Sequence, residues 1–272
     1  MSFEQVQQFL LIHGIRPNKL LGQNFMIDPS FYPILCRYAA LGKSDVVLDV
    51  GAGFGFLAKF LSDKCRAVVA VEKDPQVAAV LRGEVGGLGN VTVVEGDVLK
   101  AQLPPFNKVI SAPPYYLSTQ LTTWLLDRPL DLAVLIVQKE FAKRLVAPVG
   151  SDDYGWLTVV AQQAGEVQLL DDVPREKFYP PPEVDSVIVR LKPWRTPPFA
   201  VKDRSVFVHF TKSLFTERNK KLAKAVLPFL RSHFKLGKAE AEKIAAALPF
   251  RERRPRELSP KDFGVIVDAL PN

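Results

Sequence analysis

The clearest chemical pattern in the chain is a set of three glycines, Gly51, Gly53 and Gly55, directly after the apolar run Val46–Val50. A short β-branched run that breaks into glycines is typical of a buried strand ending in a tight turn. Apolar residues at helical spacing and a second apolar run ending at Glu72 follow, so the stretch predicts a βαβ unit. Because a residue without Cβ lets the backbone turn sharply and lets a ligand approach it, we expect a ligand over this turn.

The spacing of the glycines indicates which ligand. The dinucleotide fingerprint is G-x-G-x-x-G with a pyrophosphate at the helix N-terminus, whereas here the third glycine comes one residue early, at Gly55, and Phe56 stands in its place. This form resembles the first motif of class I S-adenosylmethionine (SAM) methyltransferases, whose cofactor has no phosphate. Glu72, about 20 residues past the turn, suits two ribose hydroxyls in either case. The stretch favours SAM and leaves a nicotinamide or flavin enzyme as the alternative.

A second chemical pattern stands at the end of a later strand, where Ser111 precedes the turn Ala112, Pro113, Pro114 and Tyr115. The exocyclic amine of a nucleobase is a poor nucleophile because its lone pair is delocalised into the ring. A catalyst must therefore accept hydrogen bonds from that amine and hold it in line with the methyl donor. In an [Asn/Asp/Ser]-Pro-Pro-[Tyr/Phe] turn the first side chain and a proline carbonyl accept, and the aromatic ring stacks on the base. Direct displacement then needs no strong general base, and the two patterns together favour SAM.

These patterns need a sheet that brings several strand ends to one edge. Apolar runs predict strands at 46–50, 67–71, 91–94, 108–111, 130–138, 166–172 and 184–192, with helices at 3–13, 30–41, 75–82, 119–127, 139–147 and 155–164. Strands that alternate with helices, followed by two consecutive strands, predict an α/β fold of the class I methyltransferase, Rossmann-like kind, with a mostly parallel sheet and an antiparallel edge. Asp97 follows the third strand and could accept from an adenine amine or, equally, only cap a turn.

A loop at 173–182, between the last two predicted strands, ends in three consecutive prolines. Prolines lack a backbone donor and have a fixed φ, so we expect Phe178 and Tyr179 to stay out of any strand ladder. An aromatic residue in a rigid loop beside the ligand edge could be a stacking platform for a base. An aromatic residue that only covers the core is an equal alternative.

Basic residues are concentrated in the last quarter of the chain. The formal net charge is +7, and residues 201–272 hold 16 Lys and Arg against 8 Asp and Glu, while residues 1–200 hold 20 against 21. The proline-rich stretch 192–198 is typical of a linker, and helical spacing at 203–217, 219–234, 238–247 and 259–270 follows it. We expect a domain of residues 1–195 and a small basic helical domain of residues 196–272. Such a tail favours a polyanionic partner, with a merely solvated basic face as the alternative.

Composition excludes several other classes of protein. With 47% hydrophobic and 24% charged residues, the chain is not disordered as a whole. No apolar run approaches the roughly 20 residues that a bilayer span needs, and the N-terminus does not resemble a signal peptide. Cys36 and Cys65 fit neither a disulfide framework nor a metal site. We therefore expect a cytoplasmic protein with no membrane association and no metal.

With these patterns in place, the sequence resembles the KsgA/RsmA family of dimethyladenosine transferases in an archaeal style. The matching stretches are KLLGQNFMID at 19–28, VLDVGAGFG at 47–55, VEKD at 71–74, EGDVL at 95–99, PPYYLST at 113–119, QKEFAKRL at 138–145, VPREKFYPPPEVDSVIVRL at 173–191, FTERNKKL at 215–222 and RPRELSPKDF at 254–263. KLLGQNF and FYPPPEVDS are far more specific than the glycine turn. The resemblance implies SAM-dependent N6-methylation, usually dimethylation, of adenines near the 3′ end of small-subunit rRNA, by a monomer that binds this rRNA or the immature small ribosomal subunit.

The resemblance also implies roles for individual residues. The residues expected at SAM are Gln23, Asn24, Met26, Gly51, Ala52, Gly53, Gly55, Glu72, Lys73, Asp97, Val98 and Ala112. Those expected at the reacting adenine are Ala112, Pro113, Pro114, Tyr115 and Phe178, with the two rings sandwiching a flipped-out or unpaired base. Those expected to bind rRNA phosphates are Lys212, Arg218, Lys220, Lys221, Arg251, Arg253 and Arg254.

One position departs from the family pattern, because Ala112 stands where the family usually has Asn. The carbonyls of Ala112 and Pro113 could suffice, Ser111 could substitute, or transfer could be weakened or absent. Losing one aimed hydrogen bond typically costs about 100- to 1,000-fold in rate. A weakened or inactive RNA-binding assembly factor is therefore one alternative function, and methylation of large-subunit rRNA is another.

Overall fold

The structure, a computed structural model, describes residues 3–18 and 21–271. It divides into two compact units, one of Met1–Ala142 with Val167–Pro193 and one of Lys143–Glu166 with Trp194–Asn272. This division differs from the expected domains of residues 1–195 and 196–272 in two places, since Lys143–Glu166 belongs with the tail and the tail begins at Trp194. No helix in the described ranges has the length and apolar character needed to cross a bilayer.

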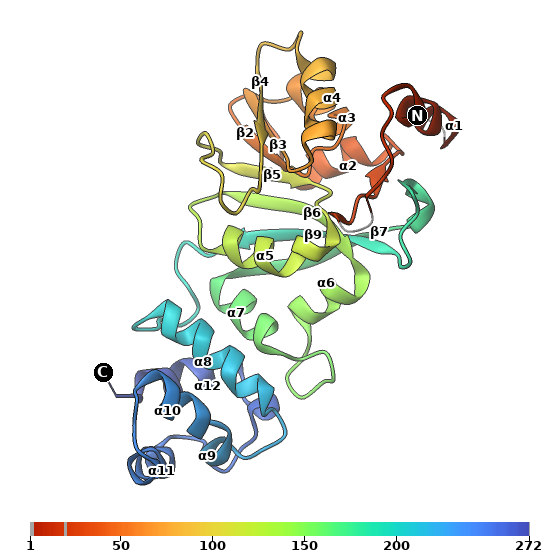
Figure 1. The fold of residues 1–272 in the computed structure, drawn as a ribbon. Helices are drawn as coiled ribbons and strands as arrows, with labels where there is room; N and C mark the ends of the chain where they lie inside the picture. Colours follow the sequence, from red (N-terminus) through yellow and green to blue (C-terminus); the bar gives the residue numbers. More distant parts are fainter. Residues whose placement is uncertain (1–2, 19–20, 272) are drawn as a thin grey trace. The chain divides into compact units, whose positions relative to one another are not determined.

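The first unit is built on a seven-stranded sheet (Figure 1). Its strands are β2 (Val46–Val50), β3 (Ala67–Glu72), β4 (Val91–Glu95), β5 (Lys108–Ser111), β6 (Leu132–Gln138), β7 (Gly165–Val173) and β9 (Ser186–Pro193). Their order is β4-β3-β2-β5-β6-β9-β7. The pairs from β4 to β6 are parallel, and β6 pairs with β9 antiparallel. The expected α/β class with an antiparallel edge is confirmed.

Helices connect these strands, as the sequence predicts. They are α1 (Phe3–Ile12), α2 (Phe31–Tyr38), α3 (Phe56–Ser62), α4 (Pro75–Val85), α5 (Ser118–Leu126) and α6 (Lys139–Val146). Leu57 and Leu61 of α3 are buried against Val47 and Val68 of the sheet, because their four-residue spacing puts them on one helix face. The Asp74 carboxylate accepts from the Gln76 amide at the start of α4, which caps this helix.

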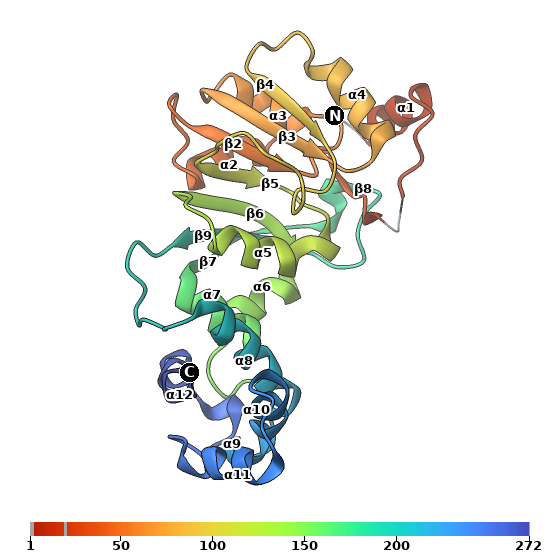
Figure 2. The same cartoon turned by 60° about the vertical axis from the view of Figure 1, so that its left-hand side comes forward.

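A two-stranded ladder, β1 (Phe25–Met26) with β8 (Phe178–Tyr179), lies beside the main sheet (Figure 2). The strands are antiparallel, with Phe25 opposite Tyr179 and Met26 opposite Phe178. The expectation that Phe178 and Tyr179 stay out of a ladder was wrong. The prolines follow the pair at 180–182, so they end β8 without removing the donors of its two residues.

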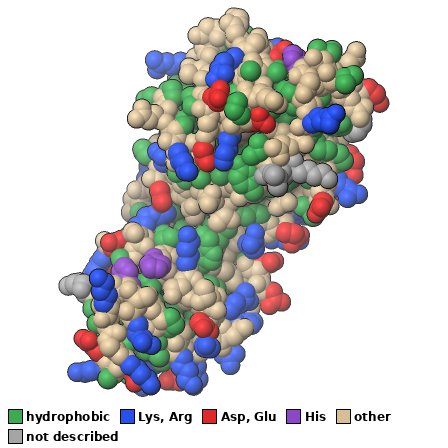
Figure 3. All heavy atoms as spheres, in the orientation of Figure 1, with side chains coloured by type: hydrophobic (Ala, Val, Ile, Leu, Met, Phe, Trp, Pro, Cys, Tyr) green, Lys and Arg blue, Asp and Glu red, His purple; other side chains and the backbone are tan. Residues whose placement is uncertain are grey.

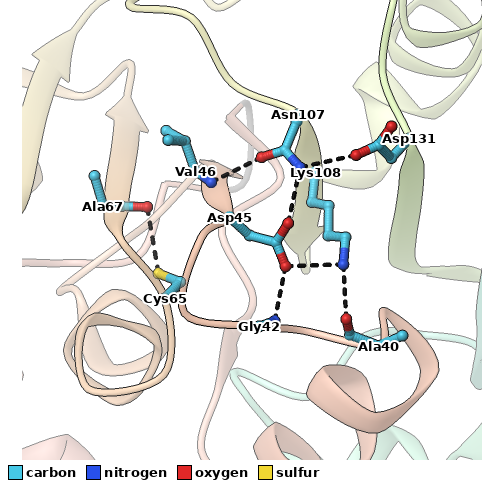
Figure 4. Close-up of polar contacts among 9 residues, drawn as sticks. All are labelled: Ala40, Gly42, Asp45, Val46, Cys65, Ala67, Asn107, Lys108 and Asp131. Carbon is cyan, nitrogen blue, oxygen red and sulfur yellow. Dashed lines mark hydrogen bonds and ion pairs between the residues drawn. The ribbon is translucent and has the colours of Figure 1, made fainter.

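A polar network joins the amino ends of β2, β5 and β6 (Figure 4). The Asp45 carboxylate accepts from the Gly42 amide at 2.7 Å, from Lys108 Nζ at 2.8 Å and from Asn107 Nδ2 at 2.8 Å. Asn107 Nδ2 also donates to Asp131 at 2.9 Å. Because each member has several partners, this network ties three strand starts together.

The second unit is helical, as the tail sequence predicts. Its helices are α7 (Trp156–Ala164), α8 (Arg204–Thr216), α9 (Leu222–Ala225), α10 (Leu227–His233), α11 (Lys238–Ala247) and α12 (Pro260–Asp268). The single helix expected over 219–234 is two helices that meet at Val226. Pro228 lies in the first turn of α10, where its missing N–H needs no partner. Phe207, Phe210 and Phe229 lie in the core of the unit.

The segment 143–166 belongs to this unit because tail residues hold it. Tyr154 is fully buried and its hydroxyl donates to the Leu258 carbonyl at 2.7 Å. Arg218 donates to the Asp152 carbonyl at 3.0 Å, and Arg256 to the Gly150 carbonyl at 3.1 Å. Two tail arginines thus satisfy carbonyls of the loop before α7, contacts that linear sequence reasoning did not connect.

Candidate active site

A pocket in the first unit lies at the carboxyl ends of β2 to β5. The predicted site residues that line it are Gln23, Asn24, Gly51, Gly53, Glu72, Lys73, Asp97, Val98, Ala112 and Pro114. An adjoining chamber shares Asn24, Gly51, Gly53 and Ala112 with the pocket and adds the predicted residues Met26 and Ala52. The glycine turn, the strand-end acids and the proline turn therefore meet in one place, as parallel strand ends in such folds do.

Some predicted residues do not line either cavity. Pro113, Tyr115, Phe178 and Gly55 are absent from both linings. A Cβ on Gly55 would lie 2.6 Å from a methyl carbon of Leu81, so this glycine serves helix packing. The first lysine and leucine of the KLLGQNF motif, at positions 19 and 20, lie outside the described residues.

The glycine turn and the proline turn come into close contact at Gly51. Its φ is +68°, and a Cβ there would lie 2.6 Å from Pro114 Cδ. The amides of Gly51 and Ala52 donate to the Val71 carbonyl at 2.8 and 3.0 Å. A glycine is needed at this position because only glycine combines this φ with such a close approach.

The Glu72 carboxylate organises the floor of the pocket. Its Oε1 accepts from the amides of Lys73 and Asp74 at 2.8 and 2.9 Å, and its Oε2 from the Gly53 amide at 3.0 Å. Glu72 is 8% exposed, and this burial raises its pKa, with the three amides acting in the opposite direction. A carboxylate has about four acceptor sites, so one remains for a ligand hydroxyl.

Asp49 is a functional candidate that the sequence reasoning missed. It lies on β2, is 2% exposed and lines the adjoining chamber. Its Oδ2 has no hydrogen-bond partner among the described residues. Burial, together with the nearby Glu72 charge, raises the pKa of Asp49 to about 7. The signal available in the sequence was a single acid inside the apolar run VVLDV; such a group is costly without a partner, which points to a cationic ligand group.

Side chains of the KLLGQNFMID motif, at positions 23 and 28, bind residues on either side of the pocket. Gln23 Nε2 donates to Asp74 Oδ2 at 2.8 Å, and Gln23 Oε1 accepts from the Asn18 amide at 2.8 Å. Lys177 Nζ lies 2.7 Å from Asp28 Oδ2 and, with Ser30, lowers the pKa of Asp28 to about 2. The most distinctive stretches of the chain, near residues 23 and 178, are therefore physically joined beside the pocket.

Lys73 and Asp97, two of the residues expected at SAM, form an ion pair with each other. Lys73 Nζ lies 3.2 Å from Asp97 Oδ2, and Asp97 Oδ1 accepts from the Leu99 amide at 3.0 Å. Partial burial raises the pKa of Asp97, but these hydrogen bonds outweigh it and the pKa is lowered. Asp97 is thus ionised at neutral pH and can accept from an amine.

The aromatic residues near the proline turn differ from the predicted sandwich. The rings of Tyr115 and Phe178 are 6.4 Å apart at 68°, in edge-to-face contact, so no base fits between them in this arrangement. Tyr115 Oη and Ser186 Oγ are 2.6 Å apart, and Phe178 is 2% exposed. Tyr116, which the sequence reasoning did not select, is 50% exposed and lines the pocket.

Ser111 is not available to replace the missing Asn side chain. Its hydroxyl donates to the Val50 carbonyl at 2.7 Å and accepts from the Val50 amide at 3.1 Å. Ser111 is also 0% exposed. The hypothesis that Ser111 substitutes at Ala112 is therefore wrong, and the backbone carbonyls of the turn are the acceptors that remain.

Most of the predicted RNA contacts in the second unit already have partners. The ion-paired ones are Lys220 with Glu217 at 2.8 Å, Lys221 with Glu252 at 2.7 Å, Arg253 with Asp262 at 3.3 Å, Arg251 with Glu252 at 3.7 Å and Arg218 with Asp152 at 3.9 Å. Arg218 and Arg251 donate to backbone carbonyls. The side chains of Lys212 and Arg254 have no carboxylate partner in the described part of the chain.

Comparisons with known proteins identify the family of this chain. The family model for ribosomal RNA adenine dimethylase matches residues 14–254. A probable ribosomal RNA small subunit methyltransferase A of Methanosarcina barkeri is 35% identical, over 99% of this chain and 93% of the relative, and the protein of that name from Thermococcus kodakarensis is 36% identical, over 95% and 91%.

Two solved structures share the fold over nearly the whole chain. A dimethyladenosine transferase from Plasmodium falciparum has a TM-score of 0.76 and 27% identity, covering 89% of this chain and 95% of its own. The 23S rRNA methyltransferase ErmE has a TM-score of 0.64 and 26% identity, covering 91% and 99%. The chain therefore belongs to the ribosomal RNA adenine dimethylase family.

Proposed function

We propose that this chain is a SAM-dependent methyltransferase that modifies N6 of adenines near the 3′ end of small-subunit rRNA. The observation that carries the proposal is the partnerless, buried Oδ2 of Asp49, a residue that lines a chamber sharing wall residues with the pocket of Glu72 and Asp97. SAM carries one ammonium, two vicinal ribose hydroxyls and one adenine amine. Three acids, lining the pocket and the chamber next to it, match those three donors in kind, so the residues present fit this cofactor.

Each acid then has one role in cofactor binding. Asp49 holds the ammonium of the methionine part, since a buried carboxylate without a partner gains most from a positive group. The free acceptor site of Glu72 takes one ribose hydroxyl, and Asp97 accepts from the adenine amine beside Val98. Met26 and Ala52 border the chamber of Asp49. SAM, when bound, supplies a sulfonium methyl for direct displacement.

On the substrate side, the proline turn orients the target amine. The carbonyls of Ala112 and Pro113 accept from it, because Ser111 is committed to Val50. Tyr115 is held by Ser186, so a sandwich with Phe178 requires the two rings to move apart. Tyr116, exposed at the pocket, is the ring that a base can reach first.

The choice of the small subunit rests on the curated relatives, which are named as small-subunit enzymes. The higher TM-score with the dimethyladenosine transferase than with the 23S enzyme supports the same choice. We further propose that the enzyme acts as a monomer on the immature small ribosomal subunit in the cytoplasm. The basic tail supports an RNA partner, and the free thiols of Cys36 and Cys65 suit a reducing compartment.

The test is transfer of labelled methyl from SAM to undermethylated small subunits, with mass spectrometry of the rRNA. We expect slow transfer by the natural chain, stopping mainly at monomethyladenine, and about 100-fold faster transfer by Ala112→Asn, which restores the side-chain acceptor. Asp49→Asn is the matched loss-of-cofactor control.

Three outcomes would contradict parts of this proposal. Rapid dimethylation that Ala112→Asn leaves unchanged would show that the alanine does not weaken transfer. Methylation of large ribosomal subunits in preference to small ones would identify large-subunit rRNA as the substrate. Binding of SAM and RNA without transfer, even by Ala112→Asn, would leave an assembly factor that has lost the reaction.

A further inference from the structure

Two exposed histidines stand side by side in the second unit, His209 on α8 and His233 on α10. Their ring centroids are 5.6 Å apart, at 74°. Phe229 lies beneath both, stacked on His233 at 4.9 Å and 14° and edge-on to His209 at 5.3 Å. Phe229 itself is 1% exposed, so a core residue supports the pair from below.

Aromatic contacts, and not hydrogen bonds, hold these rings in place. Phe234 also lies edge-on to His233, at 4.8 Å and 87°. Within the described ranges neither imidazole donates or accepts a side-chain hydrogen bond. These ring contacts fix the orientation of two histidines that are both exposed residues.

Unneutralised cations surround the histidines. Lys212 lies one turn along α8 from His209, with its Nζ 4.4 Å from the Trp156 ring. Arg231 and Lys235 flank His233 and are exposed. These three cations have no carboxylate partner in the described part of the chain, unlike Lys220 and Lys221. In Figure 3 blue side chains lie on both sides of the two adjacent purple ones.

A metal does not explain the pair, since the described residues contain no group of three or more His, Cys, Asp or Glu that could hold one. Both histidines are exposed, whereas Phe229 between them is 1% exposed. Planar rings among unpaired cations are the combination that binds single-stranded nucleic acid, with bases on the rings and phosphates on the cations.

We propose that His209 and His233 form a stacking site for an unpaired nucleotide of the RNA substrate, whose flanking phosphates bind Lys212 and Lys235. This inference rests on the proposed function for the identity of the partner. It places the RNA contact on α8 and α10. Among the residues that the resemblance implied, it keeps Lys212 but not the paired cations at 218–221 and 251–253.

The test is fluorescence anisotropy of a labelled single-stranded fragment of small-subunit rRNA with the full chain, without SAM. We expect the double substitution His209→Ala with His233→Ala to weaken binding about tenfold, because one stacked base is lost. His233→Phe keeps a ring and should retain near-natural affinity. Lys212→Gln should lower the slope of log affinity against log salt by about one. The matched control is Lys220→Gln with Lys221→Gln, which should change affinity less than twofold.

The proposed stacking site would be wrong if the double alanine variant bound the RNA as tightly as the natural chain. It would also be wrong if the double glutamine variant at Lys220 and Lys221 lost as much affinity as the double alanine variant. If the alanine pair lowers the melting temperature, His209→Gln with His233→Gln gives the same test with smaller packing changes. Normal RNA binding with weakened binding to intact subunits would also overturn it, by indicating a protein partner. Failure of SAM binding or methyl transfer would defeat the proposed function and leave this RNA result standing.

Discussion

Two aspartates at opposite ends of β2 have opposite surroundings. Asp45, just before the strand, accepts from Lys108, Asn107 and Gly42. Asp49, near the other end, is more deeply buried, and its Oδ2 has no partner among the described residues. Burial acts to raise the pKa of both, but the partners of Asp45 outweigh it and lower that pKa, while the pKa of Asp49 rises to about 7.

Along β2, the aspartate at one end therefore stabilises the fold and the aspartate at the other end is available to bind a ligand. A satisfied acid at the amino edge ties β2 to β5 and to the loop before β6, where no ligand is needed. An unsatisfied acid at the carboxyl edge costs folding free energy, and a fold keeps such a group where a ligand compensates for it. Substitutions around Asp45 should therefore change the free energy of unfolding, whereas substitutions of Asp49 should change the affinity for SAM.

The largest expected effect is on stability at the amino edge. Lys108→Met should lower the free energy of unfolding by about 3 kcal/mol, because it leaves the Asp45 charge buried with one ionic partner removed. Thermal or denaturant unfolding measures this, and SAM affinity should not change. The matched control is Lys59→Met, whose pair with Glu84 is largely exposed and should be worth less than about 1 kcal/mol. Equal losses in the two variants would contradict the stabilising role of the network.

At the carboxyl edge the effect should appear in binding. Asp49→Asn should raise the Kd for SAM about 30-fold, the equivalent of about 2 kcal/mol for a lost charge-assisted hydrogen bond. Isothermal calorimetry measures it. Asp45→Asn, the matched aspartate substitution at the other end, should destabilise the fold and leave the Kd within twofold. A natural Kd in Asp49→Asn would remove Asp49 from the cofactor site.

These two edges also show how far sequence reasoning reaches. Strands β2 and β3 were predictable because their β-branched apolar runs are buried on both faces, and the glycine turn because its spacing is specific. Asp49 was not selected, because one acid inside VVLDV does not reveal whether a partner lies across the sheet. The partners of Arg218 lie at 151–154, far along the chain, so composition alone could not show that this arginine is structural.

The pH dependence of SAM binding should be the next smaller effect. Since the ammonium binds ionised Asp49, whose pKa is about 7, SAM affinity should fall as the pH drops below 7. The expected loss is about fivefold between pH 7 and 6 and approaches about tenfold per pH unit below pH 6. The folding stability of the protein without SAM depends on pH in the opposite direction. A raised pKa means that the folded state keeps the proton, so this contribution to stability is lost as pH rises through about 7.

Asp49→Asn is the control for both slopes, and it should flatten each of them. For Asp45, whose pKa is lowered, the stabilising contribution is present at neutral pH and is lost as the pH falls through the lowered pKa. Unfolding measured from pH 3 to 8, with and without SAM, separates the two aspartates. A SAM affinity independent of pH in this range would mean that Asp49 does not titrate at the site.

The smallest effect concerns a satisfied contact at the carboxyl edge, the 2.6 Å hydrogen bond between Tyr115 and Ser186. If this bond only orients the ring beside the target amine, Ser186→Ala should lower the methyl-transfer rate about fivefold, the equivalent of about 1 kcal/mol, with the KM for SAM unchanged. Tyr115→Phe removes the same bond from its other side and should lower the rate by the same factor. The double variant should then be no slower than either single one, because both remove one interaction. Additive losses would instead mean that the serine acts on the reaction by a route separate from the tyrosine, and the carboxyl edge would hold a further group that contacts the substrate.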